Sequence, residues 1–330
     1  MTVYISEDAD SLRWSDPEWI RDAQSWIDDR LNDLGVSREG AIAQIYARSW
    51  STVLRVPTSD GVLFFKASSP VQAMEVALVK ALASWTADVV APLASDEQRG
   101  WMLMRDAGTR LRELPVKADP AVWKSIVRQY ARLQLTVAPH VGTLLALGVR
   151  DLRLDVLPDR FARFLADEEL LLVGRDGGLT RAEHARLLEW QPIFGDLCVD
   201  LSKYGVPETI EHNDLHSANV FLDGDRAYFW DWGDSSISHP FHTMRTTLAV
   251  IANALEVGAD HASLWPIRVA YLSEFGDPDD LAKPFELAQR TAAVTNVLTW
   301  APFVRAMPPA FRKRYERSVA DDARMILDVI

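Results

Sequence analysis

Two short polar segments near residue 220 place the strongest constraint on how this chain can fold. The first, residues 211–221, reads EHNDLHSANVF and contains Asp214 and Asn219. The second, residues 229–234, reads FWDWGD and contains Asp231. Asp214 can take a proton from an attacking hydroxyl, and the oxygens of Asn219 and Asp231 are ligands that Mg²⁺ prefers. These three side chains predict a site for metal-assisted phosphoryl transfer.

The residues between Asn219 and Asp231 predict a β-hairpin. Strand-like residues 220–222 and 227–230 flank an Asp-Gly dipeptide, which is a strong hairpin signal. His212 is expected to brace the preceding loop, because an imidazole can link carbonyls and carboxylates. For the His-x-Asp triplet alone, a chance group of polar residues is the better interpretation. The spacing of Asn219 and Asp231 on either side of a hairpin makes a functional site the better interpretation.

A lysine on an apolar strand is a second, independent indication. Residues 62–66 read VLFFK, and the period of two places Phe64 and Lys66 on one face. Such a strand tolerates a charge only where the charge is paired or functional. The helix expected over residues 71–85 contains one acid, Glu75, so an ion pair with Lys66 is predicted. The alternative is a strand-end lysine that reaches solvent beside an exposed acid.

The remaining strand and helix signals divide the chain into a first part built mainly of strands and a second part built mainly of helices. A helix is expected to start at Ser15-Asp16-Pro17 and to stop at Gly35. Strand-like segments with one helix follow up to about residue 105, and helical segments dominate beyond it. This order predicts an α+β protein of two lobes. The first lobe, residues 1–105, would be a small antiparallel sheet with strands at 41–48, 51–57, 62–67, 89–93 and 101–105. The second, residues 106–330, would be mainly helical, with helices at 120–137, 157–169, 181–203, 239–255 and beyond.

Composition narrows the class of protein further. Of 330 residues, 48% are hydrophobic and 25% are charged, which is typical of a globular protein with a core. No apolar run approaches the ~20 residues that span a bilayer, so no membrane segment is expected. The net charge of −12 disfavours a nucleic-acid partner.

The expected location is the cytoplasm. The single cysteine, Cys198, excludes an internal disulfide and suits a reducing compartment. Residues 1–16 are acidic and lack the charged and then apolar pattern of a secretion signal. Cys198 itself is expected to be a buried apolar residue.

These motifs resemble those of the aminoglycoside phosphotransferase and choline kinase family, small-molecule relatives of the protein kinases. The resemblance spans about residues 36–260 and is most specific at 211–234, on the motifs quoted above. It implies a bilobal, protein-kinase-like fold with a small antiparallel-sheet N-lobe, a larger mainly helical C-lobe, and ATP or GTP between them. The resemblance would also make Asp214 the base, with Asn219 and Asp231 as the ligands of Mg²⁺.

The same resemblance implies the nucleotide contacts. Lys66 would hold the α- and β-phosphates, and Glu75 would orient Lys66. Residues 101–105, which read WMLMR, resemble the interlobe hinge, so the backbone of Leu103 and Met104 would meet the nucleotide base.

The chain departs from the protein-kinase pattern in its phosphate loop. Residues 41–57 contain no glycine, so hydroxyls and amides around Ser49 and Ser51 would contact phosphate instead. No Ala-Pro-Glu segment with an activation loop follows Asp231. Both departures argue against a protein kinase.

The predicted activity is ATP- or GTP-dependent phosphorylation of a hydroxyl on a small molecule. The acceptors left open are an aminoglycoside or other antibiotic, an amino sugar or sugar, a choline-like alcohol, and homoserine. The acidic net charge and the crowding of Asp214, Asp231 and Asp234 favour an acceptor that carries an amine. The alternative is a nucleotide-binding pseudokinase or regulatory module, which intact Lys66 and Asn219 argue against. The oligomeric state is left open.

Overall fold

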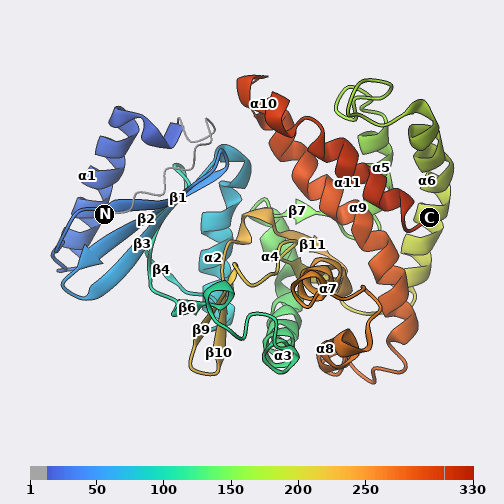
Figure 1. The fold of residues 1–330 in the computed structure, drawn as a ribbon. Coiled ribbons are helices and arrows are strands. Elements are labelled where there is room, and N and C mark those ends of the chain that lie inside the picture. The colour runs from blue at the N-terminus through green and yellow to red at the C-terminus, as the bar shows by residue number, and fades with distance from the viewer. Residues whose placement is uncertain (1–12, 308) are drawn as a thin grey trace. The chain divides into compact units, whose positions relative to one another are not determined.

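The computed structural model describes residues 13–307 and 309–330 (Figure 1). The chain divides into two compact units, one ending at Gly108 and the other beginning at Thr109. The prediction that no secretion signal is present rests mainly on residues 1–12, which lie outside the described residues. Within the described residues, no helix is both long and apolar enough to cross a membrane.

The first unit is built on a five-stranded antiparallel sheet with the strand order β1-β2-β3-β5-β4, drawn in blue to teal in Figure 1. The fourth strand begins three residues later than the predicted 89–93, because its extent is set by pairing. Asp96 lies opposite Trp101 across the turn at residues 97–100, so the strand runs back from Asp96 along β5. The strands are β1 (Ala43–Ala47), β2 (Ser51–Thr58), β3 (Gly61–Ser68), β4 (Pro92–Asp96) and β5 (Trp101–Arg105).

Helix α1 (Pro17–Asp33) packs on this sheet through aromatic side chains. Its N-terminus forms as predicted: the Asp16 carboxylate accepts a hydrogen bond from the Glu18 backbone N–H at 2.7 Å. The Trp26 ring lies 5.6 Å from the ring of Phe65 and 5.8 Å from that of Trp101. Burial of Phe65 against α1 fixes which face of β3 is apolar.

The register of β3 therefore directs Lys66 away from α1. Successive side chains of a strand point to opposite faces, so Lys66 emerges on the face opposite Phe65. Helix α2 (Met74–Trp85) supplies the partner of that lysine, Glu75, in its first turn. Helix α2 begins three residues after the predicted start, because residues 70–72 form a short 3₁₀ turn at a proline.

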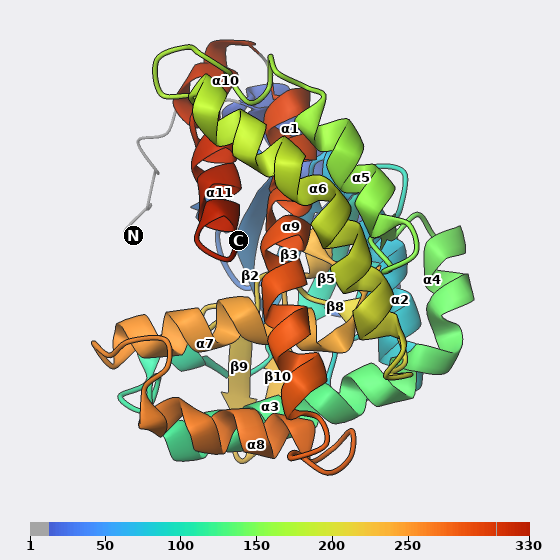
Figure 2. The same cartoon turned by 90° about the vertical axis from the view of Figure 1, so that its right-hand side faces the viewer.

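Helices dominate the second unit, with α3 packed along α8, and α9 packed against α5, α6 and α11 (Figure 2). The predicted helices at 120–137 and 181–203 agree with α3 and α6. The helix predicted at 239–255 starts at Thr243, because residues 240–242 form a 3₁₀ turn that contains a proline. The helices are α3 (Pro120–Val137), α4 (Val141–Ala146), α5 (Leu157–Leu165), α6 (Arg181–Ser202), α7 (Thr243–Ala254), α8 (Trp265–Leu272), α9 (Ala282–Ala306), α10 (Pro309–Tyr315) and α11 (Ser318–Leu327).

Two small sheets complete the second unit. One has the order β10-β9-β6 and contains the predicted hairpin, and the other has the order β7-β11-β8. Their shortest strands were not predicted, because two or three residues are too few for an alternating pattern. The strands are β6 (Thr109–Arg110), β7 (Arg150–Asp151), β8 (Thr209–Glu211), β9 (Val220–Asp223), β10 (Arg226–Phe229) and β11 (Ser236–Ser238).

Candidate active site

The two polar segments singled out in the sequence connect these two small sheets. The polar loop, residues 212–219, leaves β8 and enters β9, and the acidic turn, residues 230–235, leaves β10 and enters β11. Strand β9 is hydrogen-bonded to β10, and β11 is hydrogen-bonded to β8. Each segment is therefore held at both ends beside the other.

Hydrogen bonds also tie the middle of the polar loop to the acidic turn. The ring Nε2 of His212 lies 2.8 Å from the carbonyl oxygen of Trp230. The side-chain amide of Asn213 donates to the carbonyl of Asp234 at 2.8 Å, and the Trp230 N–H donates to the carbonyl of Asn219 at 2.9 Å. These bonds leave little freedom in how the two segments approach each other.

Asp231 stands in the acidic turn in a backbone conformation that non-glycine residues rarely adopt. Its φ of 65° and ψ of 63° lie in the left-handed region, which costs free energy and persists only where the surroundings impose it. The neighbouring Trp232 is buried, and its indole N–H donates to the carbonyl of Phe229 at 3.0 Å. The turn thus fixes the direction of the Asp231 side chain through buried neighbours.

Asp214 lies in the polar loop with its carboxylate held by two side chains. The amide nitrogen of Asn219 donates to the carbonyl and to Oδ2 of Asp214, each at 2.9 Å. His216 Nε2 lies 3.2 Å from Oδ1 of Asp214. His216 Nδ1 accepts the N–H of Ala218 at 3.1 Å, so in the neutral ring Nε2 carries the proton and donates to Asp214. The Asp214 side chain is 40% exposed and so remains accessible to a substrate.

His216 was not among the site residues predicted from the sequence, although its ring contacts Asp214. The signal that could have found it is its position two residues after Asp214 in a loop that must turn sharply into β9. His212, by contrast, is fully buried, and burial lowers its pKa while the nearby carboxylates of Asp214 and Asp231 act in the opposite direction. Both carboxylates are therefore close enough to His212 to affect its pKa.

In the first unit, Lys66 and Glu75 form a buried ion pair. The lysine Nζ lies 2.5 Å from Glu75 Oε1, and the two side chains are 2% and 1% exposed. Ser68 Oγ donates to the other carboxylate oxygen at 2.7 Å. Removing two charges from water is costly, and a pair this enclosed persists only with close geometry and additional hydrogen bonds. The lysine is therefore held in one place rather than reaching solvent from the end of β3.

Ser49 lies in the glycine-free loop between β1 and β2, and Ser51 is the first residue of β2. The hydroxyls of both serines are buried and have no hydrogen-bond partner within the described residues. The loop is anchored on one side by the Trp14 indole, which donates to the carbonyl of Arg48 at 2.5 Å. Covered hydroxyls of this kind would meet a phosphate only after a change of rotamer or of the loop.

Leu103 and Met104 lie inside the sheet rather than at its end. Strand β5 is paired with β3 on one side and with β4 on the other. The backbone groups of an interior strand are used by its neighbours, which argues against the prediction that these two residues present their backbone to a nucleotide base. The chain leaves the sheet after Arg105, and residues 106–108 are the nearest backbone not used by the strands.

Comparison with known proteins identifies the family. Residues 36–250 match the model of the phosphotransferase enzyme family known as APH. The chain belongs to this family. No curated protein matches the chain by sequence.

Solved structures show the same fold at low sequence identity. A macrolide 2'-phosphotransferase from Brachybacterium faecium superposes with a TM-score of 0.60 at 15% identity, covering 91% of this chain and 97% of that one. An ethanolamine kinase from Plasmodium vivax gives 0.59 at 11% identity, covering 92% and 86%. The GDP complex of an aminoglycoside 2'-phosphotransferase gives 0.57 at 13% identity, covering 92% and 98%. The fold is thus the bilobal, protein-kinase-like α+β fold of small-molecule kinases, and this APH member is a phosphotransferase.

The polar loop and the acidic turn offer an oxygen donor set that suits Mg²⁺. Among the described residues, no group of three or more His, Cys, Asp or Glu side chains could hold a metal ion alone. Mg²⁺ is commonly bound by one or two protein oxygens together with phosphate oxygens and water. The amide nitrogen of Asn219 is used by Asp214, which leaves Oδ1 as the atom that Asn219 can offer beside Asp231.

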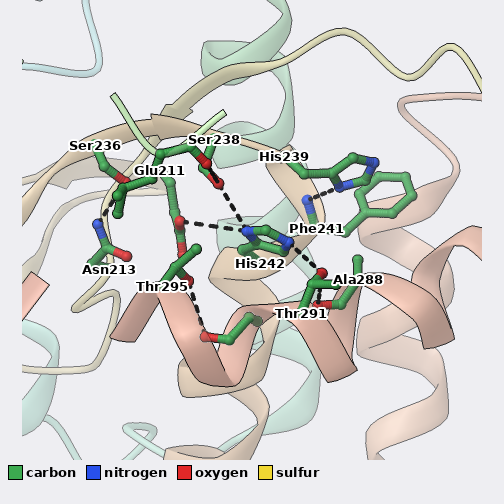
Figure 3. Close-up of polar contacts among 12 residues, drawn as sticks. Glu211, Asn213, Ser236, Ser238, His239, Phe241, His242, Ala288, Thr291 and Thr295 are labelled. Atoms are coloured by element: carbon green, nitrogen blue, oxygen red, sulfur yellow. Dashed lines mark hydrogen bonds and ion pairs between the residues drawn. The ribbon is translucent and has the colours of Figure 1, made fainter. Parts of the chain in front are cut away.

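A buried polar cluster lies directly behind the polar loop (Figure 3). Both carboxylate oxygens of Glu211 are buried and have no hydrogen-bond partner in the described part of the chain. Nδ1 of His242 lies 4.0 Å from Glu211 Oε2, which is beyond hydrogen-bond distance, and is 2.9 Å from Ser238 Oγ. His242 Nε2 is 2.8 Å from the hydroxyl of Thr291.

Burial keeps this cluster neutral. It raises the pKa of Glu211 to about 8 and lowers the pKa of His242 to about 3. The 4.0 Å contact between them is therefore not an ion pair near neutral pH. Glu211 is the last residue of β8, so this buried carboxyl group lies immediately before the polar loop.

We predict that Glu211 makes the stability of the protein fall as pH rises. The folded state holds the proton more tightly than the unfolded chain, so stability is lost between about pH 4.5 and pH 8. The slope would approach roughly 1.4 kcal/mol per pH unit at its steepest. Glu211→Gln should flatten this dependence in urea unfolding across the window, whereas the exposed control Glu97→Gln should not. Parallel curves for wild type and Glu211→Gln would contradict the prediction.

Proposed function

We propose that this phosphotransferase moves the γ-phosphoryl group of ATP or GTP to a hydroxyl of a small molecule. The observation that carries the proposal is the Asp214 carboxylate, which is accessible and is aimed by Asn219 and His216. It lies in a loop bonded to the turn that presents Asp231. A positioned base beside two metal-ligand oxygens is what phosphoryl transfer to an alcohol requires.

In this reaction the acceptor oxygen bonds to the γ-phosphorus, and the bond from that phosphorus to the bridging oxygen breaks. The nucleoside diphosphate leaves with the bridging oxygen, and Asp214 takes the proton of the hydroxyl. Hydrogen bonds from Asn219 and His216 fix the direction in which the carboxylate accepts that proton. Mg²⁺, held by Asn219 and Asp231, would supply positive charge to the phosphates.

The first unit would supply the remaining nucleotide contacts. Lys66 would bind the α- and β-phosphates, with Glu75 holding its Nζ in place, as the 2.5 Å ion pair supports. The amides and hydroxyls around Ser49 and Ser51 would approach the phosphates after local adjustment. The backbone of residues 106–108 suits the nucleotide base better than that of Leu103 and Met104, which the sheet already uses.

The acceptor is proposed to be a hydroxylated small molecule of the kinds that similar proteins use. The names of the similar structures include macrolide and aminoglycoside phosphotransferases and an ethanolamine kinase. A sugar, choline or homoserine belongs to the same chemical range. The competing proposal of a pseudokinase is disfavoured by the geometry, because Asp214, Asn219 and Lys66 are each held by specific partners.

We predict that Asp214→Asn lowers kcat by roughly 10² to 10⁴, the usual contribution of a positioned base. Nucleotide affinity should be unchanged, because the side chain keeps its shape and acts on the acceptor. The measurement is phosphate transfer to a panel of amino sugars, macrolides, amino alcohols and sugars. Asp225→Asn, in the exposed turn of the hairpin, is the matched control and should retain full turnover. Turnover close to wild type in Asp214→Asn would remove Asp214 from the role of base.

We predict that Lys66→Met abolishes most activity and also destabilises the first unit. Removal of one partner of a buried pair leaves an uncompensated charge, which costs about 3–5 kcal/mol. The double variant Lys66→Met with Glu75→Gln should recover stability but not kcat. Lys80→Met is the control, because Lys80 forms an exposed ion pair with Glu97 and its side chain is 50% exposed. A stable double variant with wild-type kcat would show that another cation serves the phosphates.

We predict that Asp231→Asn removes the metal dependence of nucleotide binding. A ligand that binds only the folded state raises Tm, and the rise grows with its affinity. Wild type should therefore show a larger nucleotide-induced Tm shift with Mg²⁺ than with a chelator. In Asp231→Asn the two shifts should be equal, while the exposed control Asp223→Asn should behave as wild type. An undiminished Mg²⁺ effect in Asp231→Asn would place the metal elsewhere.

A further inference from the structure

A cavity of about 510 Å³ lies in the second unit among β7, α5 and α9. Its volume is within the range of small-molecule sites. Four arginines and one carboxylate, Asp151, contribute the charges of its lining. The four are Arg150 from β7, Arg160 and Arg163 from α5, and Arg305 from α9.

The acids around this cavity already have arginine partners. Asp151 accepts hydrogen bonds from Nε and Nη2 of Arg153, each at 2.9 Å. Those bonds lower the pKa of Asp151. Asp167 forms an ion pair with Arg305. Both carboxylates are thus already paired with arginines of the protein, so neither requires a cationic ligand.

Two of the arginines are, by contrast, uncommitted. Within residues 13–307 and 309–330, the side chains of Arg160 and Arg163 make no hydrogen bond or ion pair, and both are exposed. They lie three residues apart on α5, so their side chains project from neighbouring positions on one face of the helix. A guanidinium offers a planar pair of N–H donors that matches a carboxylate or phosphate.

Arg150 adds a third donor at the inner end of the cavity. Its Nη1 donates to the carbonyl of Gly233 at 3.2 Å, and its guanidinium lies 5.1 Å above the ring of Phe303. Its Nη2 is buried and has no hydrogen-bond partner among the described residues. An arginine stays charged in proteins. The buried Nη2 of Arg150 therefore lacks a hydrogen-bond acceptor that would offset the free energy of burying it.

The cavity adjoins the candidate active site through the sheet β7-β11-β8. Arg150 and Glu211 both lie opposite Ser236 of the central strand. Two strand spacings separate them by roughly 10 Å, and the polar loop starts immediately after Glu211. Arg150 lines the cavity and also donates to the carbonyl of Gly233, so it connects the cavity to the acidic turn.

We propose that this cavity binds the phosphoryl acceptor, and that the acceptor carries a carboxylate or phosphate group on an apolar body. This inference rests on the proposed function and names the substrate class of the same site. Arg160 and Arg163 bind the anion from α5, and apolar side chains of Phe164 and Leu298 contact the body. Pro302, also in the wall, has no N–H, so the Leu298 carbonyl lacks its usual helix donor and can accept from a hydroxyl.

This assignment opposes the amine-bearing acceptor that the net charge favours. The charge of −12 is spread over the whole chain, and exposed charges beyond a Debye length of about 8 Å are largely screened at physiological salt. Among the residues that line the cavity, four arginines stand against one carboxylate, Asp151: Arg150, Arg160, Arg163 and Arg305. The groups that a ligand in the cavity would contact therefore carry a surplus of positive charge.

The test compares four probes that share one six-carbon body and a terminal hydroxyl. They are hydroxyhexanoate, hydroxyhexyl phosphate, aminohexanol and hexanediol, with binding measured by titration calorimetry on the full chain. The two anions should bind more tightly than the amine and the diol, and their affinity should fall as salt is added. The stronger of the two anions distinguishes a carboxylate from a phosphate acceptor. Tighter binding of the amine, or no binding of either anion, overturns the proposal.

The same titrations on variants locate the site. Arg160→Gln with Arg163→Gln should weaken the anions about tenfold, the expected sum for two exposed ion pairs, and leave nucleotide affinity unchanged. Arg186→Gln, an exposed arginine of α6 outside the cavity, is the control. Equal anion affinity in the double variant and the control overturns the assignment to this cavity.

Turnover separates this inference from the proposed function. Asp214-dependent phosphorylation of the amine or the diol, unaffected by the arginine variants, would overturn the anionic acceptor and leave the kinase in place. Arginine-dependent anion binding without phosphorylation of any probe would remove the proposed function and leave the cavity as an anion site. Phosphorylation of an anionic probe, with KM raised and kcat retained in the arginine double variant, supports both.

Discussion

The pairing of β11 with β8 is the interaction on which the candidate active site depends. Strand β8 ends where the polar loop begins, and β11 starts where the acidic turn ends, so one short ladder aligns both segments. The same central strand also pairs with β7, which brings Arg150 to the edge of the site. Three strands of two or three residues thus gather the proposed base, the turn proposed to bind the metal and an arginine from distant parts of the chain. Tertiary packing must hold them, because ladders this short are not stable alone.

The protein deals with buried charge in three ways, each suited to its place. Lys66 and Glu75 are paired at 2.5 Å, which offsets the cost of burying each charge and fixes the lysine. The carboxylate oxygens of Glu211 have no hydrogen-bond partner within the described residues, so burial favours the neutral form of this group. Arg150 cannot lose its charge, and it is only partly satisfied by the carbonyl of Gly233. The first arrangement suits the phosphate-binding role proposed for Lys66, and the last suits the anion-binding role proposed for Arg150.

The sequence was most informative where local chemistry determines structure. The Asp-Gly turn predicted the β9–β10 hairpin, and Asp16 with Pro17 predicted the start of α1, because both signals act within a few residues. The Lys66–Glu75 contact could also be predicted, since an apolar strand followed by a helix with one acid leaves few alternatives. The bilobal kinase-like fold followed from these elements and from the resemblance they carry.

What the sequence could not predict depends on long-range pairing. Strand β7 is two residues long and reads as loop, yet it places Arg150 against the acidic turn through a parallel pairing with β11. The position of Leu103 and Met104 inside the sheet likewise follows from the addition of β4 to the edge of β5, which no local pattern encodes. The charge of the cavity is a third case. Its arginines come from segments about 140 residues apart and gather only when α5 and α9 pack together. Net charge averages over the whole surface, whereas a ligand interacts with the few groups within a Debye length. For the charge of the acceptor, the local arrangement of arginines therefore outweighs the overall acidity of the chain.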